Sequence, residues 1–138
     1  MTPRQIELVR RSFAAVLPIR AEAASLFYDR LFATAPSVRP LFSGDMKVQG
    51  AKLMAAIAMV VDALDRLETV IEDVRELARR HVRYGVVEAH YAVVGAALLW
   101  TLEQGLGKDA FTDEVKDAWA AAYAALIGAM IDAAAAAV

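Results

Sequence analysis

The sequence predicts a single domain built only of α-helices. Apolar residues make up 59% of the 138 positions, and most of them are alanine, leucine and valine. Alanine is the strongest helix former, and the β-branched residues do not alternate with polar ones as in strands. A chain of this length can bury one core. We therefore expect one domain over residues 1–138, with no length left for an attached nucleotide- or flavin-binding module.

Composition also excludes several classes of protein. The formal net charge is −2, whereas a general nucleic-acid binder carries a basic face. No uncharged apolar stretch reaches the roughly 18 residues of a membrane span, the C-terminal Ala120–Val138 coming nearest, and the N-terminus lacks the apolar segment of a secretory signal. Because the chain has no cysteine, disulfides, thiolate metal sites and thioether-attached cofactors are excluded. We expect a cytoplasmic protein without a membrane or nucleic-acid partner.

The chain begins with the pattern of a helix start. Thr2 suits the N-cap, Pro3 the first helical position and Gln5 the partner in a capping box. Apolar residues then follow helical spacing as far as Pro18. A second helix is expected over about 19–32, before the next proline.

The middle of the chain predicts a short helix, a loop and a long helix. One turn of helix is expected over 38–41, followed by a loop over 43–45 in which Asp45 can cap the next helix. The segment from about 46 to 64 is long enough and apolar enough to form a buried helix.

Three helices are expected in the remainder of the chain. After a charged connector, a helix should run from about Val70 to Arg83 and end at Gly85. Another is expected over 88–106, and Thr112 or Asp113 would open the last one. Some seven helices of unequal length do not match an up-down bundle of equal rods.

His81 is the most informative residue for function, since the chain has only two histidines. Helical spacing puts its ring on one face with Val74, Leu77 and Ala78. An imidazole on an apolar face is more often an ordinary core residue than a metal ligand. Spacing by itself therefore leaves both interpretations open.

A second group of residues upstream could line the other side of a flat cofactor: Tyr28, Phe42, Gln49 and Leu53. Gln49 and Leu53 are four residues apart and so share a helix face. A buried tyrosine hydroxyl usually needs a partner, which for Tyr28 could also be a backbone carbonyl or water. Gln49 could equally be a boundary residue that points into solvent.

Taken together, the order and spacing of five segments resemble the bacterial globin family. The closest likeness is to single-domain bacterial haemoglobins and to the globin domain of flavohaemoglobins, including forms likened to neuroglobin. The likeness extends over essentially the whole chain and implies a globin fold, with about seven helices around a haem pocket. The segments are Phe27–Phe32, Val38–Phe42, Gln49–Leu53, Arg80–His81 and His90–Gly95.

The resemblance implies a role for each candidate residue around haem b. His81 would be the proximal ligand of the iron, and Tyr91 would approach that side. Tyr28 and Gln49 would donate hydrogen bonds to a bound diatomic molecule, with Leu53 beside them. The cofactor would also contact two further residues, Phe42 by stacking and Lys52 near a propionate.

The function implied by the resemblance is reversible binding of oxygen, nitric oxide and carbon monoxide, with oxygen transport as one use. Nitric oxide dioxygenation with a separate reductase is a hypothesis. Two alternatives remain: a gas or redox sensor, and a haem-free globin-like domain that binds a regulatory partner. In the haem-free case, Tyr28, Gln49 and His81 would be merely structural.

Two other side chains compete for the iron in this interpretation. His90 is the rival for the proximal position, although the family places only the neighbouring tyrosine near it. No histidine precedes His81, so bis-histidyl coordination is disfavoured. Lys52, Tyr28 or water could be an internal sixth ligand, and a surface lysine near a propionate is the favoured interpretation of Lys52.

One departure from the family concerns the support of His81. The glutamate that flavohaemoglobin-type globins carry in the last helix corresponds here to Ala134, and Asp132 is a poor substitute because it points elsewhere on the helix. We therefore expect the imidazole N–H to donate to a backbone carbonyl, such as that of Leu77, and we expect weak peroxidase activity.

The remaining conspicuous residues have structural interpretations. Arg79, Arg80 and Arg83 could pair with propionates or form a solvated helix end. Trp100 and Trp119 are expected to anchor the core.

Overall fold

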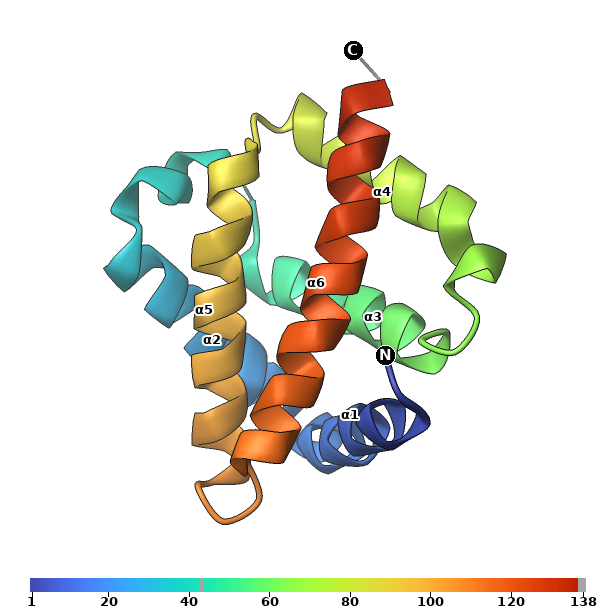
Figure 1. Cartoon of the computed structure of the whole chain (residues 1–138). Coiled ribbons are helices and arrows are strands. Elements are labelled where there is room, and N and C mark those ends of the chain that lie inside the picture. Colours follow the sequence, from blue (N-terminus) through green and yellow to red (C-terminus); the bar gives the residue numbers. More distant parts are fainter. Residues whose placement is uncertain (43, 137–138) are drawn as a thin grey trace.

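The computed structural model describes residues 1–42 and 44–136, and within these residues it contains helices and no strand (Figure 1). The all-α prediction is therefore confirmed. The described residues form six α-helices and three short 3-10 helices, which precede the second, third and fourth α-helices. Their bounds are α1 (Pro3–Val16), η1 (Leu17–Ile19), α2 (Arg20–Thr34), η2 (Pro36–Leu41), α3 (Met46–Asp62), η3 (Leu67–Val70), α4 (Ile71–Arg83), α5 (Glu88–Leu106) and α6 (Asp113–Ala136).

The helices pack in a layered arrangement in which α6 is central. It contacts α1, α4 and α5, and Figure 1 shows α5 and α6 running side by side. Away from α6, α2 packs against both α3 and α5. Of the described helices, none is by itself both long and apolar enough to cross a membrane, although the bent pair Leu67–Arg83 and Glu88–Leu106 passes jointly on length and composition.

The predicted caps are present at two helix starts. Thr2 Oγ1 accepts the Gln5 N–H at 3.1 Å, and Gln5 Oε1 accepts the Thr2 N–H at 3.0 Å, which completes the capping box. Asp45 Oδ1 accepts the Lys47 N–H at 2.8 Å and caps α3. Each cap satisfies a backbone donor that the helix itself leaves free.

The connector before α4 differs from the prediction. Residues Leu67–Val70 form the 3-10 helix η3, so α4 begins at Ile71 and not at Val70. Thr69 closes this turn through its N–H and its hydroxyl, which both donate to the Arg66 carbonyl. A 3-10 turn of four residues has no long-range apolar period, and for this reason the spacing did not indicate it.

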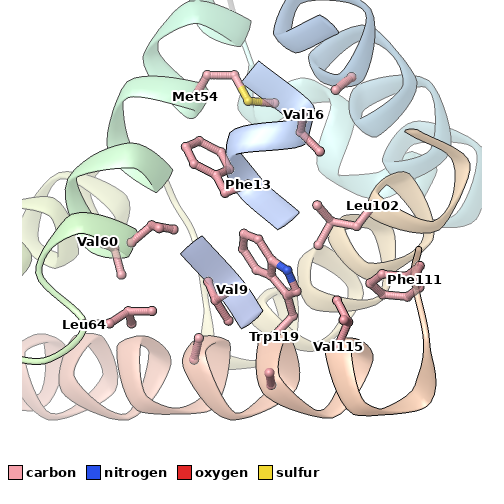
Figure 2. Packing of buried hydrophobic residues seen from close by; sticks show 14 of the residues in the cluster. Val9, Phe13, Val16, Met54, Val60, Leu64, Leu102, Phe111, Val115 and Trp119 are labelled. Carbon is pink, nitrogen blue, oxygen red and sulfur yellow. The ribbon is translucent and has the colours of Figure 1, made fainter. Parts of the chain in front are cut away.

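The main core lies between α1, α3, α5 and α6 (Figure 2). The rings of Phe13 and Trp119 meet edge to face with centroids 6.2 Å apart. The Trp119 indole N–H donates to Ser12 Oγ at 2.8 Å, and that hydroxyl donates to the Leu8 carbonyl at 2.7 Å. The buried polar atoms are thus paired, as burial requires, and the predicted anchoring by Trp119 is confirmed.

A polar clamp joins α1 to the end of α3. Arg10 donates to the Val61 carbonyl at 3.2 Å, to the Asp62 carbonyl at 2.7 Å and to Asp65 Oδ1 at 2.8 Å. The hydrogen bond from Arg10 holds the pKa of the Asp65 carboxyl below its usual value. Carbonyls at a helix C-terminus lack intrahelical partners, so this arginine satisfies the end of α3 from another helix.

Gly95 allows α5 and α6 to approach closely at Tyr123. A Cβ built on Gly95 would lie 2.7 Å from Cε2 of the Tyr123 ring. The Tyr123 hydroxyl donates to the Tyr91 carbonyl at 2.7 Å. The absence of a side chain at Gly95 therefore lets this ring lie against α5.

We expect Gly95→Ala to lower the free energy of unfolding by up to about 2 kcal/mol. The clash with the ring costs on the order of 1–3 kcal/mol, and the better helix propensity of alanine returns about 1 kcal/mol. Gly128→Ala is the matched control, because a Cβ there meets nothing within 4 Å. Urea denaturation should show the control equal to or more stable than the parent chain, and equal stability of both variants would contradict the clash.

Stability should also fall at alkaline pH because of Tyr123. Burial raises the pKa of this phenol, and the nearby Tyr91 raises it further. The contribution of this raised pKa to folding stability is complete below the pKa of about 10 that the phenol has in the unfolded chain. It is lost as pH rises above that pKa. In Tyr123→Phe, we expect a loss of about 1 kcal/mol at neutral pH and a shallower decline above pH 10. An identical alkaline slope in both proteins, measured by urea titration, would contradict this.

Candidate functional site

Tyr28 lies in an apolar cluster built around the aromatic side chains of α2 and Phe42, with residues of α3 and α5 packed against it; we call it the Tyr28 cluster. Tyr28 is 6% exposed. Its ring centroid lies 5.0 Å from that of Phe27, 5.4 Å from that of Phe42 and 5.9 Å from that of Phe32. Such packed rings hold Tyr28 in one orientation. The structure thus brings two predicted residues, Tyr28 and Phe42, into contact.

Gln49 joins this cluster from α3. Burial raises the pKa of the Tyr28 phenol, and hydrogen bonding with the Gln49 side chain opposes that rise. The two predicted donors therefore meet across the α2–α3 interface. Gln49 itself is half-buried, so it is not fully exposed to solvent, and its role beside a ligand stays a prediction.

A close helix crossing sets the position of Gln49. Gly50 is buried, and a Cβ built on it would lie only 2.9 Å from the Ala24 Cβ. The two other predicted residues on α3 lie on different faces of the helix. Leu53 is half-buried and packs against the Tyr28 cluster, whereas Lys52 is exposed. The helix thus presents Gln49 and Leu53 inward, as the four-residue spacing predicts.

His81 lies on α4, which packs against α6. Its ring is half-buried, and Nδ1 lies 2.7 Å from the Leu77 carbonyl oxygen, as the sequence predicts for an imidazole without a carboxylate partner. A carbonyl can only accept, so Nδ1 carries the proton, and in the neutral imidazole Nε2 then keeps its lone pair. The Ala134 side chain lies outside the described part of the chain, and Asp132 is exposed.

The other histidine has a local structural role. His90 Nδ1 accepts the Val87 N–H at 3.1 Å at the start of α5. Its neighbour Tyr91 is 9% exposed and packs with Val74, Ala78 and Met130, in a group we call the α4–α6 cluster. Burial raises the pKa of the Tyr91 phenol. Tyr91 thus lies with the residues of the His81 helix, whereas His90 caps the helix that follows.

The candidate residues fall into two separate apolar groups that α5 connects. The Tyr28 cluster includes Val93, Ala97 and Leu98 from α5, and the α4–α6 cluster includes Tyr91. Several apolar side chains of these groups are half-buried, and they come from five helices and the segments between them. They are Leu41, Phe42, Leu53, Leu77, Val86, Val93, Val94, Leu98 and Ile127. Half-buried apolar side chains of this kind can line a cofactor pocket.

The arginines around His81 mostly form pairs within α4. Glu76 accepts from Arg79 at 3.1 Å and from Arg83 at 3.3 Å, which lowers the pKa of the Glu76 carboxyl. Arg80 is exposed. Pairing with a propionate therefore stays a prediction for these side chains.

Trp100 departs from the prediction that it anchors the core. It is only half-buried, and the guanidinium carbon of Arg30 lies 4.9 Å from its ring centroid. The physical reason is its place on α5, where its outer face is covered by a cation from α2 instead of by apolar residues.

Sequence reasoning overlooked two residues of the Tyr28 cluster. Phe32 stacks on Tyr28 at an interplanar angle of 28°, and their spacing of four residues could have indicated this contact. Arg39 lies over Phe32 with its guanidinium carbon 5.0 Å from the ring centroid. No local pattern indicates that second contact, because η2 must first fold back onto α2.

Comparison with known proteins identifies the family. The family model described as Globin matches residues 25–130, which is most of the chain. The chain belongs to the globin family. The fold described above is accordingly the globin fold, as the sequence resemblance predicts.

Relatives of this globin include bacterial flavohemoproteins. It is 35% identical over 135 residues to a flavohemoprotein of Bordetella pertussis and 38% identical over 111 residues to one of a Burkholderia species. These matches cover 95% and 76% of this chain but only 33% and 28% of the relatives. The globin thus spans about a third of the length of these curated relatives.

Two solved structures match nearly the whole chain. A bacterial globin from Campylobacter jejuni is 28% identical, with a TM-score of 0.85 and 96% of both chains covered. An engineered carbene transferase made from a putative nitric oxide dioxygenase of Rhodothermus marinus is 27% identical, with a TM-score of 0.87, covering 98% of this globin and 94% of that chain.

Proposed function

We propose that this globin binds haem b through His81 and reversibly binds oxygen and other diatomic ligands, such as nitric oxide and carbon monoxide. The observation that carries the proposal is the His81–Leu77 contact of 2.7 Å. It leaves Nε2 with a lone pair, which is the form of imidazole that ligates iron. The donor set therefore fits haem, and haem would supply the iron centre at which a diatomic molecule binds.

The side chains on α2 and α3 support the proposed ligand binding. Tyr28 offers a hydroxyl and Gln49 an amide, and the two groups meet in a largely apolar cluster. Donors in such surroundings stabilise a ligand that carries partial negative charge more strongly than donors in water. Phe42 would stack on the cofactor, Leu53 would limit the space beside the donors, and Lys52 would reach a propionate from the surface.

Haem titration of the purified chain tests the proposal directly. We expect one haem per chain, a Soret band, and reversible spectral changes of the ferrous protein on addition of oxygen or carbon monoxide. A chain that folds but takes up no haem would contradict the proposal and favour the haem-free, partner-binding alternative. A gas sensor would share these spectra and would differ by ligand-dependent binding of a partner.

Nitric oxide dioxygenation is a second candidate function. The Tyr28–Gln49 pair and the likeness to the Rhodothermus marinus protein favour it. The reaction combines nitric oxide, oxygen and one electron to give nitrate, so it requires a reductase, either separate or attached. Many nitrate molecules per haem are expected with a supplied reductase and NADH; formation of no more than one per haem would contradict this function.

Weak peroxidase activity is expected from the haem-loaded globin. The partner of His81 is a neutral carbonyl, not a carboxylate, so the imidazole should be a less electron-rich ligand. We expect guaiacol oxidation at least about ten- to a hundredfold slower than in a dedicated haem peroxidase under the same conditions. A comparable rate in both proteins would contradict the proposed role of the carbonyl.

A further inference from the structure

Arg39 binds both backbone polar groups of Phe42. The Arg39 carbonyl accepts the Phe42 N–H at 3.1 Å, and Arg39 Nη1 donates to the Phe42 carbonyl at 3.1 Å. Phe42 follows the last residue of η2 and has an extended backbone. One residue therefore fixes the direction in which the chain leaves η2 and carries Phe42 inward.

The same side chain also contacts α2. Its guanidinium carbon lies 5.0 Å from the centroid of the Phe32 ring. A planar guanidinium can stack on a ring while its N–H groups donate at the edge, which an ammonium cannot do equally well. Arg39 thus joins Phe32 at the end of α2 to Phe42 at the end of η2.

These two rings form a triangle with Tyr28. The ring centroids of Phe32 and Phe42 are 5.4 Å apart, and they lie 5.9 Å and 5.4 Å from that of Tyr28. In a closely packed group, one ring cannot shift unless its neighbours adjust. The position of the Tyr28 ring therefore depends on the two rings that Arg39 holds.

We propose that Arg39 is a positioning residue that sets the Tyr28 hydroxyl for ligand stabilisation, through its joint hold on Phe32 and Phe42. This inference rests on the proposed function, in which Tyr28 donates to the bound ligand. Arg39 itself is exposed and acts only through the rings. The proposal thus gives a surface arginine, outside the Tyr28–Gln49 pair, a role in tuning ligand release.

The chain offers a matched control. Arg30 on α2 lies over the Trp100 ring at 4.9 Å, nearly the same geometry as Arg39 over Phe32. Trp100 is not part of the triangle. Arg30→Ala therefore removes an equivalent arginine–aromatic contact without touching the Tyr28 ring.

The test compares Arg39→Ala, Arg39→Gln, Arg39→Lys and Arg30→Ala. The NMR shifts of the Tyr28 and Phe42 ring protons are measured without haem and with haem, and the oxygen dissociation rate is measured with haem. We expect Arg39→Ala to move these resonances in both forms and to speed oxygen release about fivefold, the factor for one ordinary hydrogen bond. Arg39→Lys keeps the positive charge and should restore part of the effect. Arg39→Gln can still donate to the Phe42 carbonyl but carries no charge over the Phe32 ring, so it separates the two contributions. Arg30→Ala should change neither readout.

Distinct results would overturn the inference and the proposed function. Unchanged ring shifts and oxygen release in Arg39→Ala, with haem bound normally, would overturn only the role of Arg39. A parent chain that takes up no haem would overturn the proposed function and this role together. If Arg39→Ala does not fold, the glutamine and lysine variants decide, and parent-like values in both would overturn the inference.

Discussion

Replacing His81 with alanine should weaken haem binding at least about a hundredfold, which corresponds to about 2.8 kcal/mol of binding free energy. The reason is that His81 keeps a free Nε2 while Nδ1 is held by the Leu77 carbonyl. Without the ring, the proposed coordinate bond is absent. Haem titration followed at the Soret band measures the change, and added imidazole should restore binding by occupying the space of the lost ring.

The control for this prediction is the other histidine. His90→Ala removes the acceptor of the Val87 N–H, so it should cost roughly 1 kcal/mol of stability as the loss of a cap does. Its haem affinity should equal that of the parent. The opposite outcome, with haem lost from His90→Ala and kept in His81→Ala, would assign the proximal role to His90.

Removing either donor of the Tyr28–Gln49 pair should speed oxygen release from the haem-loaded globin. Tyr28→Phe and Gln49→Leu keep much of the side-chain volume and remove the hydroxyl or the amide. A hydrogen bond to a charged group contributes about 1.5–3 kcal/mol, so each dissociation rate should rise by about ten- to a hundredfold. Stopped-flow replacement of oxygen by carbon monoxide measures these rates.

The double variant tests whether the two donors act as a unit. Because the Gln49 side chain lies close enough to Tyr28 to lower the pKa of its phenol, their effects should not add, with a coupling of about 0.5–3 kcal/mol. Tyr84→Phe and Gln104→Leu are exposed controls with the same chemistry, and neither should alter oxygen release. Rates in Tyr28→Phe and Gln49→Leu that match these controls would show that the pair does not contact the ligand.

Local sequence signals located most helices because their chemistry is local. The capping box at Thr2, the cap at Asp45 and the bounds of α5 were all predicted, and each depends on residues within a few positions. The 3-10 helix over Leu67–Val70 was not, since so short a turn leaves no periodic signal. Helix spacing likewise indicated that Gln49 and Leu53 share a face.

The contacts of the site depended on helices far apart in the sequence. The approach of α3 to α2 at Gly50 and Ala24, and that of α5 to α6 at Gly95 and Tyr123, exist only after packing. The partial exposure of Trp100 followed from the same packing and made one prediction wrong. In each case a long-range contact decided the environment of a residue whose local pattern was uninformative.

By itself, the sequence determined the all-α class, the order of the helices and the residues available as ligands and donors. These follow from composition, periodicity and the scarcity of histidine, which are properties of the chain before it folds. Tertiary structure decided that Gln49 meets Tyr28, that Tyr91 lies with the His81 helix, and that Arg39 holds the two rings beside Tyr28. Such contacts require helices to cross at particular places, and close packing, not local propensity, determines where they cross.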